Sequence, residues 1–221
     1  MNLDLQGLIQ TLSIAAIPVI FAITLHEAAH GYVARHFGDM TAHAQGRISL
    51  NPARHIDLVG TIVVPLVMLL LSGGRFLFGW AKPVPVNYFA LRRPKSHMAW
   101  VAAAGPAVNF LQAIAWAAVL RIVLEQEPGF FATPLRFVAA AGITVNLTFA
   151  ILNLVPILPL DGGRIVFSLL PDALAARYGR MERFGLPLVL GFILLESHFH
   201  MLEPIYRASL ASLASLFGLA A

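Results

Sequence analysis

Runs of apolar residues recur along this chain, and several are long enough to cross a lipid bilayer. A transmembrane helix needs about 20 predominantly apolar residues. The run at 58–72 is shorter and contains Pro65, so it either crosses the bilayer or re-enters it from one side. The other runs are predicted spans, the last of them weaker: 7–34, 98–120, 137–157, 184–202 and 205–221. We therefore expect an all-α polytopic membrane protein with about five to six transmembrane helices.

The composition excludes most soluble classes of protein. Hydrophobic residues make up 58% of the 221 residues and charged residues only 12%, whereas a soluble domain carries about 25% charged residues. The chain contains no cysteine, which excludes disulfide frameworks and thiolate metal ligands. The apolar composition leads us to expect a lipid bilayer around the protein. No basic run is typical of a nucleic-acid-binding surface, so we expect no nucleic-acid partner.

The distribution of basic residues predicts the orientation of the spans. Lysine and arginine concentrate in the cytoplasmic loops of membrane proteins. Several of them lie in each of the segments 35–57, 73–97 and 158–183, whereas the segment 121–136 balances its two arginines with two glutamates. The first span is therefore expected to run from outside to inside. A site near its C-terminal end would lie toward the cytoplasm.

An HExxH pattern interrupts the C-terminal half of the first apolar run, at His26, Glu27 and His30. Residues four apart lie on the same face of a helix, so both histidines can bind one metal ion. Zinc favours two imidazoles and a carboxylate, and Glu27 then lies beside the site as a general base for the water that the metal activates. A charged residue within a span costs about 2.5–3.5 kcal/mol, so a chance occurrence of three ionisable groups here is disfavoured.

Asp161 is the predicted third ligand. It follows the 137–157 run within the sequence PLDGG, and the predicted topology places it on the same side of the membrane as His26 and His30. The two glycines after it allow a close approach of backbone or substrate. Without the histidines, Asp161 would be explained equally well as a helix N-cap.

Asn153 lies at the end of the same apolar run, before Pro156. A polar amide in this position suits a donor to the oxyanion that develops during peptide hydrolysis. Asparagine in a membrane helix also commonly hydrogen-bonds to a neighbouring helix, and the position alone favours this second role.

Two segments between the apolar runs are predicted to be extended. Residues 41–50 alternate partly in polarity, which indicates a short strand or hairpin. Residues 82–87 contain two prolines, which push the preceding residues out of the helical region. A substrate helix that unwinds within the membrane needs partners for its backbone groups, and an extended edge can supply them. The predicted substrate-binding residues are Gly46, Arg47, Ile48, Pro83, Val84 and Pro85.

Two other functions fit part of this pattern. A transporter or metal channel also carries ionisable residues in its spans, but along a whole route rather than at one depth. A pseudoenzyme that binds helices without cutting them would not need the glutamate of the HExxH pattern. A second metal cluster could form near the C-terminus, although the topology favours the outer membrane boundary for its members: Glu196, His198, His200 and Glu203.

Five motifs, in this order, resemble the site-2 protease family of intramembrane zinc metalloproteases: HEAAHGYVARHFGD, GRISLNPARHIDLVGT, GWAKPVPVN, AAAGPAVN and NLVPILPLDGG. The resemblance covers about residues 15–170 and is greatest to the compact branch without PDZ or CBS domains. Asn109 lies in the fourth motif. The neighbouring Gly105 allows close helix packing, so a structural role is expected for both residues.

The resemblance implies a function for the whole chain. Residues 1–221 are expected to form one intramembrane metalloprotease domain, with a core at about 7–170 and additional membrane helices at 184–221. This enzyme would hydrolyse peptide bonds within or near the transmembrane segments of single-span membrane proteins. It would reside in a bacterial or archaeal cell membrane, with its active site toward the cytoplasm.

The resemblance also implies roles for particular residues. One zinc ion per chain is expected, and no oligomeric state is predicted. The implied site consists of His26, His30 and Asp161 as zinc ligands, Glu27 as the catalytic acid and base, and Asn153 as a transition-state stabiliser.

Overall fold

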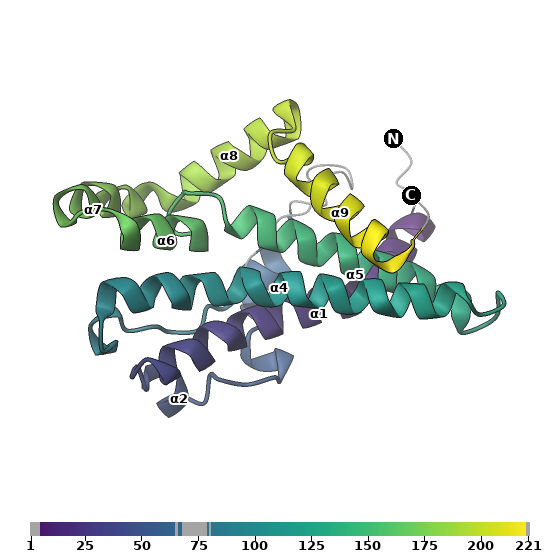
Figure 1. Cartoon of the computed structure of the whole chain (residues 1–221), viewed down its shortest axis with the longest axis horizontal. Helices are drawn as coiled ribbons and strands as arrows, with labels where there is room; N and C mark the ends of the chain where they lie inside the picture. The colour runs from purple at the N-terminus through teal and green to yellow at the C-terminus, as the bar shows by residue number, and fades with distance from the viewer. Residues whose placement is uncertain (1–4, 65, 68–78, 80, 220–221) are drawn as a thin grey trace.

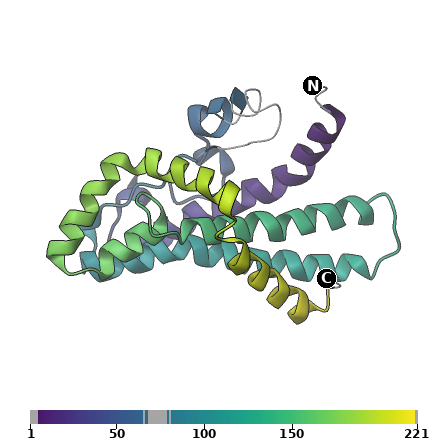
Figure 2. The same ribbon diagram turned by 90° about the horizontal axis from the view of Figure 1, so that it is seen from above.

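The protein is described from a computed structural model that covers residues 5–64, 66–67, 79 and 81–219. Helices account for most of this part of the chain, and Figure 1 shows their arrangement. Three long helices form the centre of the molecule: α1 (Leu5–His36), α4 (Pro94–Leu124) and α5 (Ala132–Asn153). They pack against one another, and α4 and α5 form an antiparallel hairpin that is visible in Figure 2.

The three long helices correspond to three of the predicted spans. The stretches Ile9–His36, Pro94–Leu124 and Ala132–Asn153 are each long and apolar enough to cross a membrane. They contain most or all of the runs 7–34, 98–120 and 137–157. The helical nature of these predicted spans is therefore confirmed.

Small residues let these helices approach closely. Ala22 on α1, Ala113 on α4 and Ala150 on α5 are fully buried. Gly142 on α5 lies against the Trp116 ring of α4, where a Cβ atom would come within 2.4 Å of the indole. Such residues are typical of helix interfaces in membranes, because lipid tails solvate larger apolar side chains as well as another helix does.

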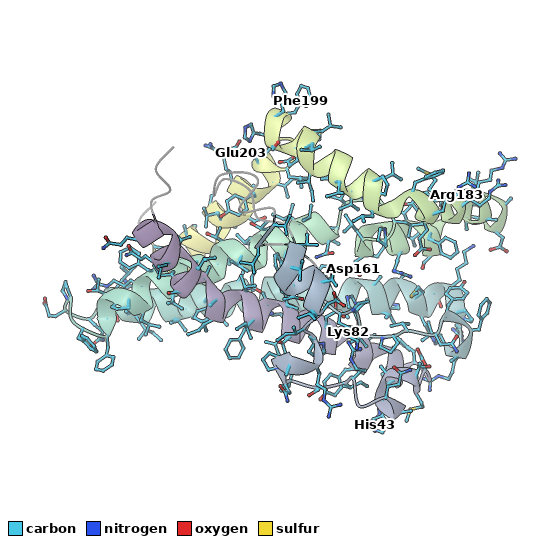
Figure 3. All side chains as sticks on the ribbon, turned by 180° about the vertical axis from the view of Figure 1, so that it is seen from behind. His43, Lys82, Asp161, Arg183, Phe199 and Glu203 are labelled. Carbon is cyan, nitrogen blue, oxygen red and sulfur yellow. The ribbon has the colours of Figure 1, made fainter. Side chains whose placement is uncertain are left out.

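The two C-terminal helices are each too short to cross a bilayer alone. Helices α8 (Gly185–Phe199) and α9 (Glu203–Phe217) contain 15 residues each, which is about 22 Å of helix against a hydrocarbon core of about 30 Å. The chain bends by 73° between them, and Phe199 lies at the apex of this bend in Figure 3. The described residues contain three candidate spans, or four if the bent pair forms one. The predicted count of five to six spans is not confirmed.

The strand predicted over residues 41–50 is wrong. Thr41–Ala44 form the short helix α2, and the residues after it continue in turns. The buried carboxylate of Asp39 accepts a hydrogen bond from the Thr41 N–H at 2.9 Å and begins this turn. Because most of the following backbone groups bond locally, they are not free to pair with a strand. No β-strand forms in the described part of the chain, so the predicted hairpin is not confirmed.

Residues 81–87 are irregular and form neither a helix nor a turn, in line with the prediction from the prolines. They lead into a short 3₁₀ helix, η3 (Tyr88–Ala90). Two further short elements precede them: η1 (Pro52–Arg54) and the π-helical η2 (Leu58–Val63). Most of the remaining 58–72 run lies outside the described residues.

The shorter helices after α5 gather at one end of the molecule, at the left in Figure 1. These elements are α6 (Asp161–Leu169), α7 (Asp172–Gly179) and η4 (Arg180–Phe184). The last turn of α1, α2 and the start of α4 lie at the same end, whereas the connection between α4 and α5 lies at the opposite end. A salt bridge of 2.5 Å between Lys95 Nζ and Asp172 Oδ1 joins the starts of α4 and α7. The segments that carry most of the basic residues therefore lie together.

Candidate metal centre

Three potential metal ligands meet between α1 and α6. His26 and His30 are one turn apart on α1, and Asp161 is the first residue of α6. One ligand atom from each of them lies within 4.8 Å of the others, and all three residues are buried. Figure 3 shows Asp161 in the interior of the molecule, between the helices. The structure thus brings together the three side chains that the sequence singled out as ligands.

The distances between the three side chains suit a tetrahedral metal ion. The Nε2 atoms of His26 and His30 are 3.0 Å apart, and they lie 3.2 and 3.4 Å from the two carboxylate oxygens of Asp161. In a zinc site with bonds of about 2.0–2.1 Å, neighbouring ligand atoms lie about 3.3 Å apart. We call these Nε2 atoms and the Asp161 carboxylate the acceptor triangle.

The protons of the two imidazoles point away from the acceptor triangle. His30 Nδ1 lies 2.7 Å from the Val101 carbonyl oxygen, and His26 Nδ1 lies 2.6 Å from Asn109 Oδ1. Both partners are oxygens that accept, so Nδ1 of each neutral ring carries the proton and Nε2 carries a lone pair. Asp161 Oδ2 is buried and has no hydrogen-bond donor among the described residues. Three acceptors that face one another fit a cation.

The charge state of Asp161 suits the same role. Burial by itself raises the pKa of its carboxyl group, whereas the positive charge that His30 and His26 carry in the metal-free protein lowers the pKa to below its ordinary value. Asp161 is therefore a carboxylate at neutral pH, as a metal ligand must be.

The glycines of the PLDGG sequence position Asp161. A Cβ atom on Gly162 would lie 2.1 Å from the Leu154 carbonyl oxygen, and one on Gly163 would lie 2.5 Å from the Leu158 nitrogen. The start of α6 therefore packs directly on the loop after α5, which only glycine permits. The alternative that Asp161 caps the helix is wrong, because Leu160 is the N-cap residue and forms no side-chain cap.

Gly105 on α4 covers the acceptor triangle. A Cβ atom at this position would lie 2.6 Å from Nε2 of both His26 and His30. The sequence predicted a packing role for this residue, and helix packing alone does not explain why the space above the two ligand atoms is left open. The absence of a side chain here leaves room for a metal ion.

Glu27 does not belong to the acceptor triangle. Its half-buried carboxylate accepts a hydrogen bond of 2.6 Å from the Val84 N–H, in the 81–87 segment. The glutamate of the HExxH pattern is thus held by backbone from a segment 57 residues away. This arrangement leaves the second carboxylate oxygen for other partners.

Several contacts hold the 81–87 segment beside Glu27. The Arg47 guanidinium donates to the carbonyl oxygens of Lys82 and Pro83, at 3.0 and 3.1 Å. Further along, the Asn87 N–H donates to the buried Asp39 carboxylate at 2.6 Å. The loops on either side of α2 therefore hold this segment beside the C-terminal half of α1.

Most of the predicted substrate-binding residues come together in this region. A Cβ atom on Gly31, one turn after Glu27, would lie 2.9 Å from Ile48 and 3.2 Å from Val84. Arg47 contacts the segment that contains Pro83 and Pro85, while Gly46 turns the chain with a φ of 62°. The predicted strand is absent, but the two segments still meet beside the HExxH helix.

Asn153 bonds to its own helix. Its side-chain Nδ2 donates to the Phe149 carbonyl oxygen at 3.0 Å, and the residue is half-buried. An asparagine amide has two donor hydrogens, so one remains after this bond.

The C-terminal histidines do not form a second metal site. Among the described residues, His26, His30 and Asp161 are the one group close enough to share an ion. Glu196 instead accepts from the Leu202 N–H at 3.1 Å, where the chain bends between α8 and α9. His200 and Glu203 lie 3.6 Å apart on the exposed surface.

Comparison with known proteins agrees with this geometry. A family model described as Peptidase family M50 matches residues 122–195. The Bacillus subtilis protein named "Putative zinc metalloprotease YwhC" is 35% identical over 206 residues, which cover 91% of this chain and 89% of that protein. Proteins named "Putative zinc metalloprotease Rip2" are 27% identical in Mycolicibacterium smegmatis and 30% in Mycobacterium tuberculosis. This chain spans 52% of each Rip2 protein.

No solved structure matches the chain significantly. The similarity to YwhC extends over nearly the whole of both sequences, and it includes both parts of the chain that supply the acceptor triangle. The chain therefore belongs to peptidase family M50, the site-2-type zinc metalloproteases of membranes.

Proposed function

We propose that the protein hydrolyses peptide bonds within or near the transmembrane segments of single-span membrane proteins, as an enzyme of regulated intramembrane proteolysis. The observation that carries this proposal is the buried acceptor triangle, whose two histidines lie on α1, a helix long and apolar enough to cross a membrane. We assign one zinc ion to each chain, with His26, His30 and Asp161 as its ligands. Zinc, when bound, would activate water and polarise the scissile carbonyl group.

The side chains around the acceptor triangle divide the remaining chemistry. Glu27 accepts a proton from the attacking water and delivers it to the leaving amine. The Val84 N–H holds one of its carboxylate oxygens, so the carboxylate is oriented before substrate arrives. The free amide hydrogen of Asn153 would stabilise the developing oxyanion.

The 81–87 segment is the proposed site for the substrate backbone. A helical substrate must unwind before cleavage, and its freed backbone groups need partners that lipid does not provide. The Val86 N–H and the Val84 carbonyl form no hydrogen bond with the described part of the chain. An extended substrate can pair with this edge, next to Glu27. Substrates with helix-destabilising residues near the cleavage site should therefore be favoured.

We propose a single domain that resides in a bacterial or archaeal cell membrane. Residues of α9, among them Tyr206, Leu213 and Phe217, pack on a cluster formed by α4 and α5. This contact supports a C-terminal part that belongs to the same domain as the protease core. The active site would face the cytoplasm, because the segments that carry most of the basic residues lie at the same end of the molecule as the site.

Single-cysteine labelling tests this orientation, since the chain contains no cysteine of its own. His43, Arg180 and Glu125 are all exposed. A membrane-impermeant thiol reagent should label Glu125→Cys in intact cells. It should label His43→Cys and Arg180→Cys only after the membrane is opened. Labelling of position 43 in intact cells would place the acceptor triangle toward the outside.

Cleavage by the purified protein in liposomes tests the proposed function directly. A panel of single-span membrane proteins should be cleaved within or near the transmembrane segment. Removal of zinc by a chelator should abolish cleavage, and added zinc should restore it. Asp161→Asn should weaken zinc binding and abolish turnover, because it replaces the anionic member of the acceptor triangle with a neutral amide.

Cleavage that continues in a metal-free preparation would exclude the zinc hydrolase. Cleavage of the panel only in loops far from the membrane would instead exclude the proposed substrate class.

A further inference from the structure

We infer that Asn109 and Asn146 are positioning residues that determine which nitrogen of His26 faces the metal. This inference rests on the proposed function, because it assigns His26 as a zinc ligand. Asn109 lies on α4 and Asn146 on α5, and neither is exposed at all. Neither belongs to the acceptor triangle.

Side-chain hydrogen bonds connect all three long helices to the candidate ligand. His26 Nδ1 lies 2.6 Å from Asn109 Oδ1. Asn109 Nδ2 donates to Asn146 Oδ1 at 2.9 Å, and Asn146 Nδ2 donates to the Gly142 carbonyl oxygen at 2.9 Å. Asn109 Nδ2 also donates to the Ala22 carbonyl oxygen at 3.3 Å.

The two backbone carbonyls allow one orientation of this chain of amides. A carbonyl oxygen only accepts, so Gly142 requires the NH₂ group of Asn146, whose oxygen then faces Asn109. Asn109 must therefore turn its own NH₂ group toward the Asn146 oxygen, and the Ala22 carbonyl requires the same orientation. Its oxygen therefore faces His26. A flip of either amide would bring two oxygens together.

The orientation of Asn109 determines the proton position on His26. Because Asn109 Oδ1 accepts, Nδ1 of the imidazole carries the hydrogen and Nε2 presents a lone pair to the acceptor triangle. His30 obtains the same orientation from the backbone carbonyl of Val101, which no substitution removes. The orientation of His26, unlike that of His30, depends on side chains.

A matched control lies one turn further along α4. Gln112 is a buried amide on the same helix, and its Nε2 has no hydrogen-bond partner among the described residues. Gln112→Leu removes a buried amide from the same helix and changes no hydrogen bond of His26. It therefore measures the effect of losing a buried amide from α4 by itself.

The test measures the zinc affinity of the full chain by competition with a chelator. Asn109→Leu should weaken zinc binding by about 10- to 100-fold, which is the usual effect of losing an outer partner of a metal ligand. Gln112→Leu should leave the affinity within about twofold of wild type, since it changes no partner of a ligand. Cobalt in place of zinc should show an altered visible spectrum in Asn109→Leu and an unaltered one in Gln112→Leu.

Asn146 acts only through Asn109, which a double variant tests. Asn146→Leu alone should weaken zinc binding by about three- to tenfold, because the orientation of Asn109 then depends on the longer bond of 3.3 Å to the Ala22 carbonyl alone. Added to Asn109→Leu, it should have no further effect on the affinity. Asn146→Leu also decides the question if Asn109→Leu does not fold.

Equal zinc affinities and cobalt spectra for Asn109→Leu and Gln112→Leu would overturn the inference, and so would independent, additive effects of the two asparagines. None of these measurements requires a substrate. A failure of the proposed function would instead appear as wild-type protein that binds zinc and cleaves no membrane protein.

Discussion

Glu27→Gln is expected to reduce peptide-bond hydrolysis by at least about 10²-fold, the lower end of what a positioned acid and base contributes. The substitution removes the group that accepts the proton of the attacking water. Zinc should stay bound, because Glu27 is not part of the acceptor triangle. The fold should also be preserved, since a glutamine oxygen can still accept the hydrogen bond from the Val84 N–H.

The measurement pairs cleavage in liposomes with the zinc content of the same preparation. The inactive variant should still co-purify with a membrane substrate, because recognition is assigned to the 81–87 segment. Glu125→Gln is the matched control, since Glu125 is exposed in the connection between α4 and α5 and forms an ion pair with Arg121. Cleavage by Glu27→Gln at nearly the wild-type rate would exclude Glu27 as the base. Loss of zinc would mean that Glu27 is itself a ligand.

Gly105→Ala is expected to remove zinc and activity together. Its effect on zinc affinity should exceed the loss of about 10- to 100-fold that follows from removing an outer partner of a metal ligand. The added Cβ would lie 2.6 Å from Nε2 of both histidines, in the space that the metal ion needs. Helix formation does not explain such a loss, because alanine is more favourable than glycine in a helix by about 0.5–1 kcal/mol.

The control for this substitution is Gly191→Ala on α8, where a Cβ atom would meet nothing within 4 Å. This variant should bind zinc and cleave substrate as the wild type does. Zinc titration and thermal unfolding of the metal-free protein separate a blocked site from a damaged fold. Unchanged zinc affinity in Gly105→Ala would show that the metal lies elsewhere.

The sequence predicted the long helices better than the short elements. The apolar runs over α1, α4 and α5 are long, and length together with hydropathy is sufficient to identify a spanning helix. The runs at 184–202 and 205–221 are also apolar, but the chain bends by 73° near residue 200. The strand predicted over 41–50 failed because a four-residue helix and turns satisfied its backbone locally.

The candidate site, too, could be predicted from the sequence only in part. His26, Glu27, His30 and Asp161 could be identified from sequence because ionisable residues are rare in apolar runs and helical spacing puts both histidines on one face. Asn109 was assigned to packing, and Asn146 was not identified at all. A polar residue within a helix indicates a buried hydrogen bond without indicating its partner.

The sequence by itself therefore determined which runs form the long helices and which side chains can hold a metal, since both depend on local composition and spacing. Only the tertiary structure decided what surrounds those side chains. The Val84 N–H meets Glu27 across 57 positions of the chain, and Asn109 meets His26 across 83. Contacts between such distant residues depend on how whole helices pack, and Gly105 shows that the same packing leaves room for the ion.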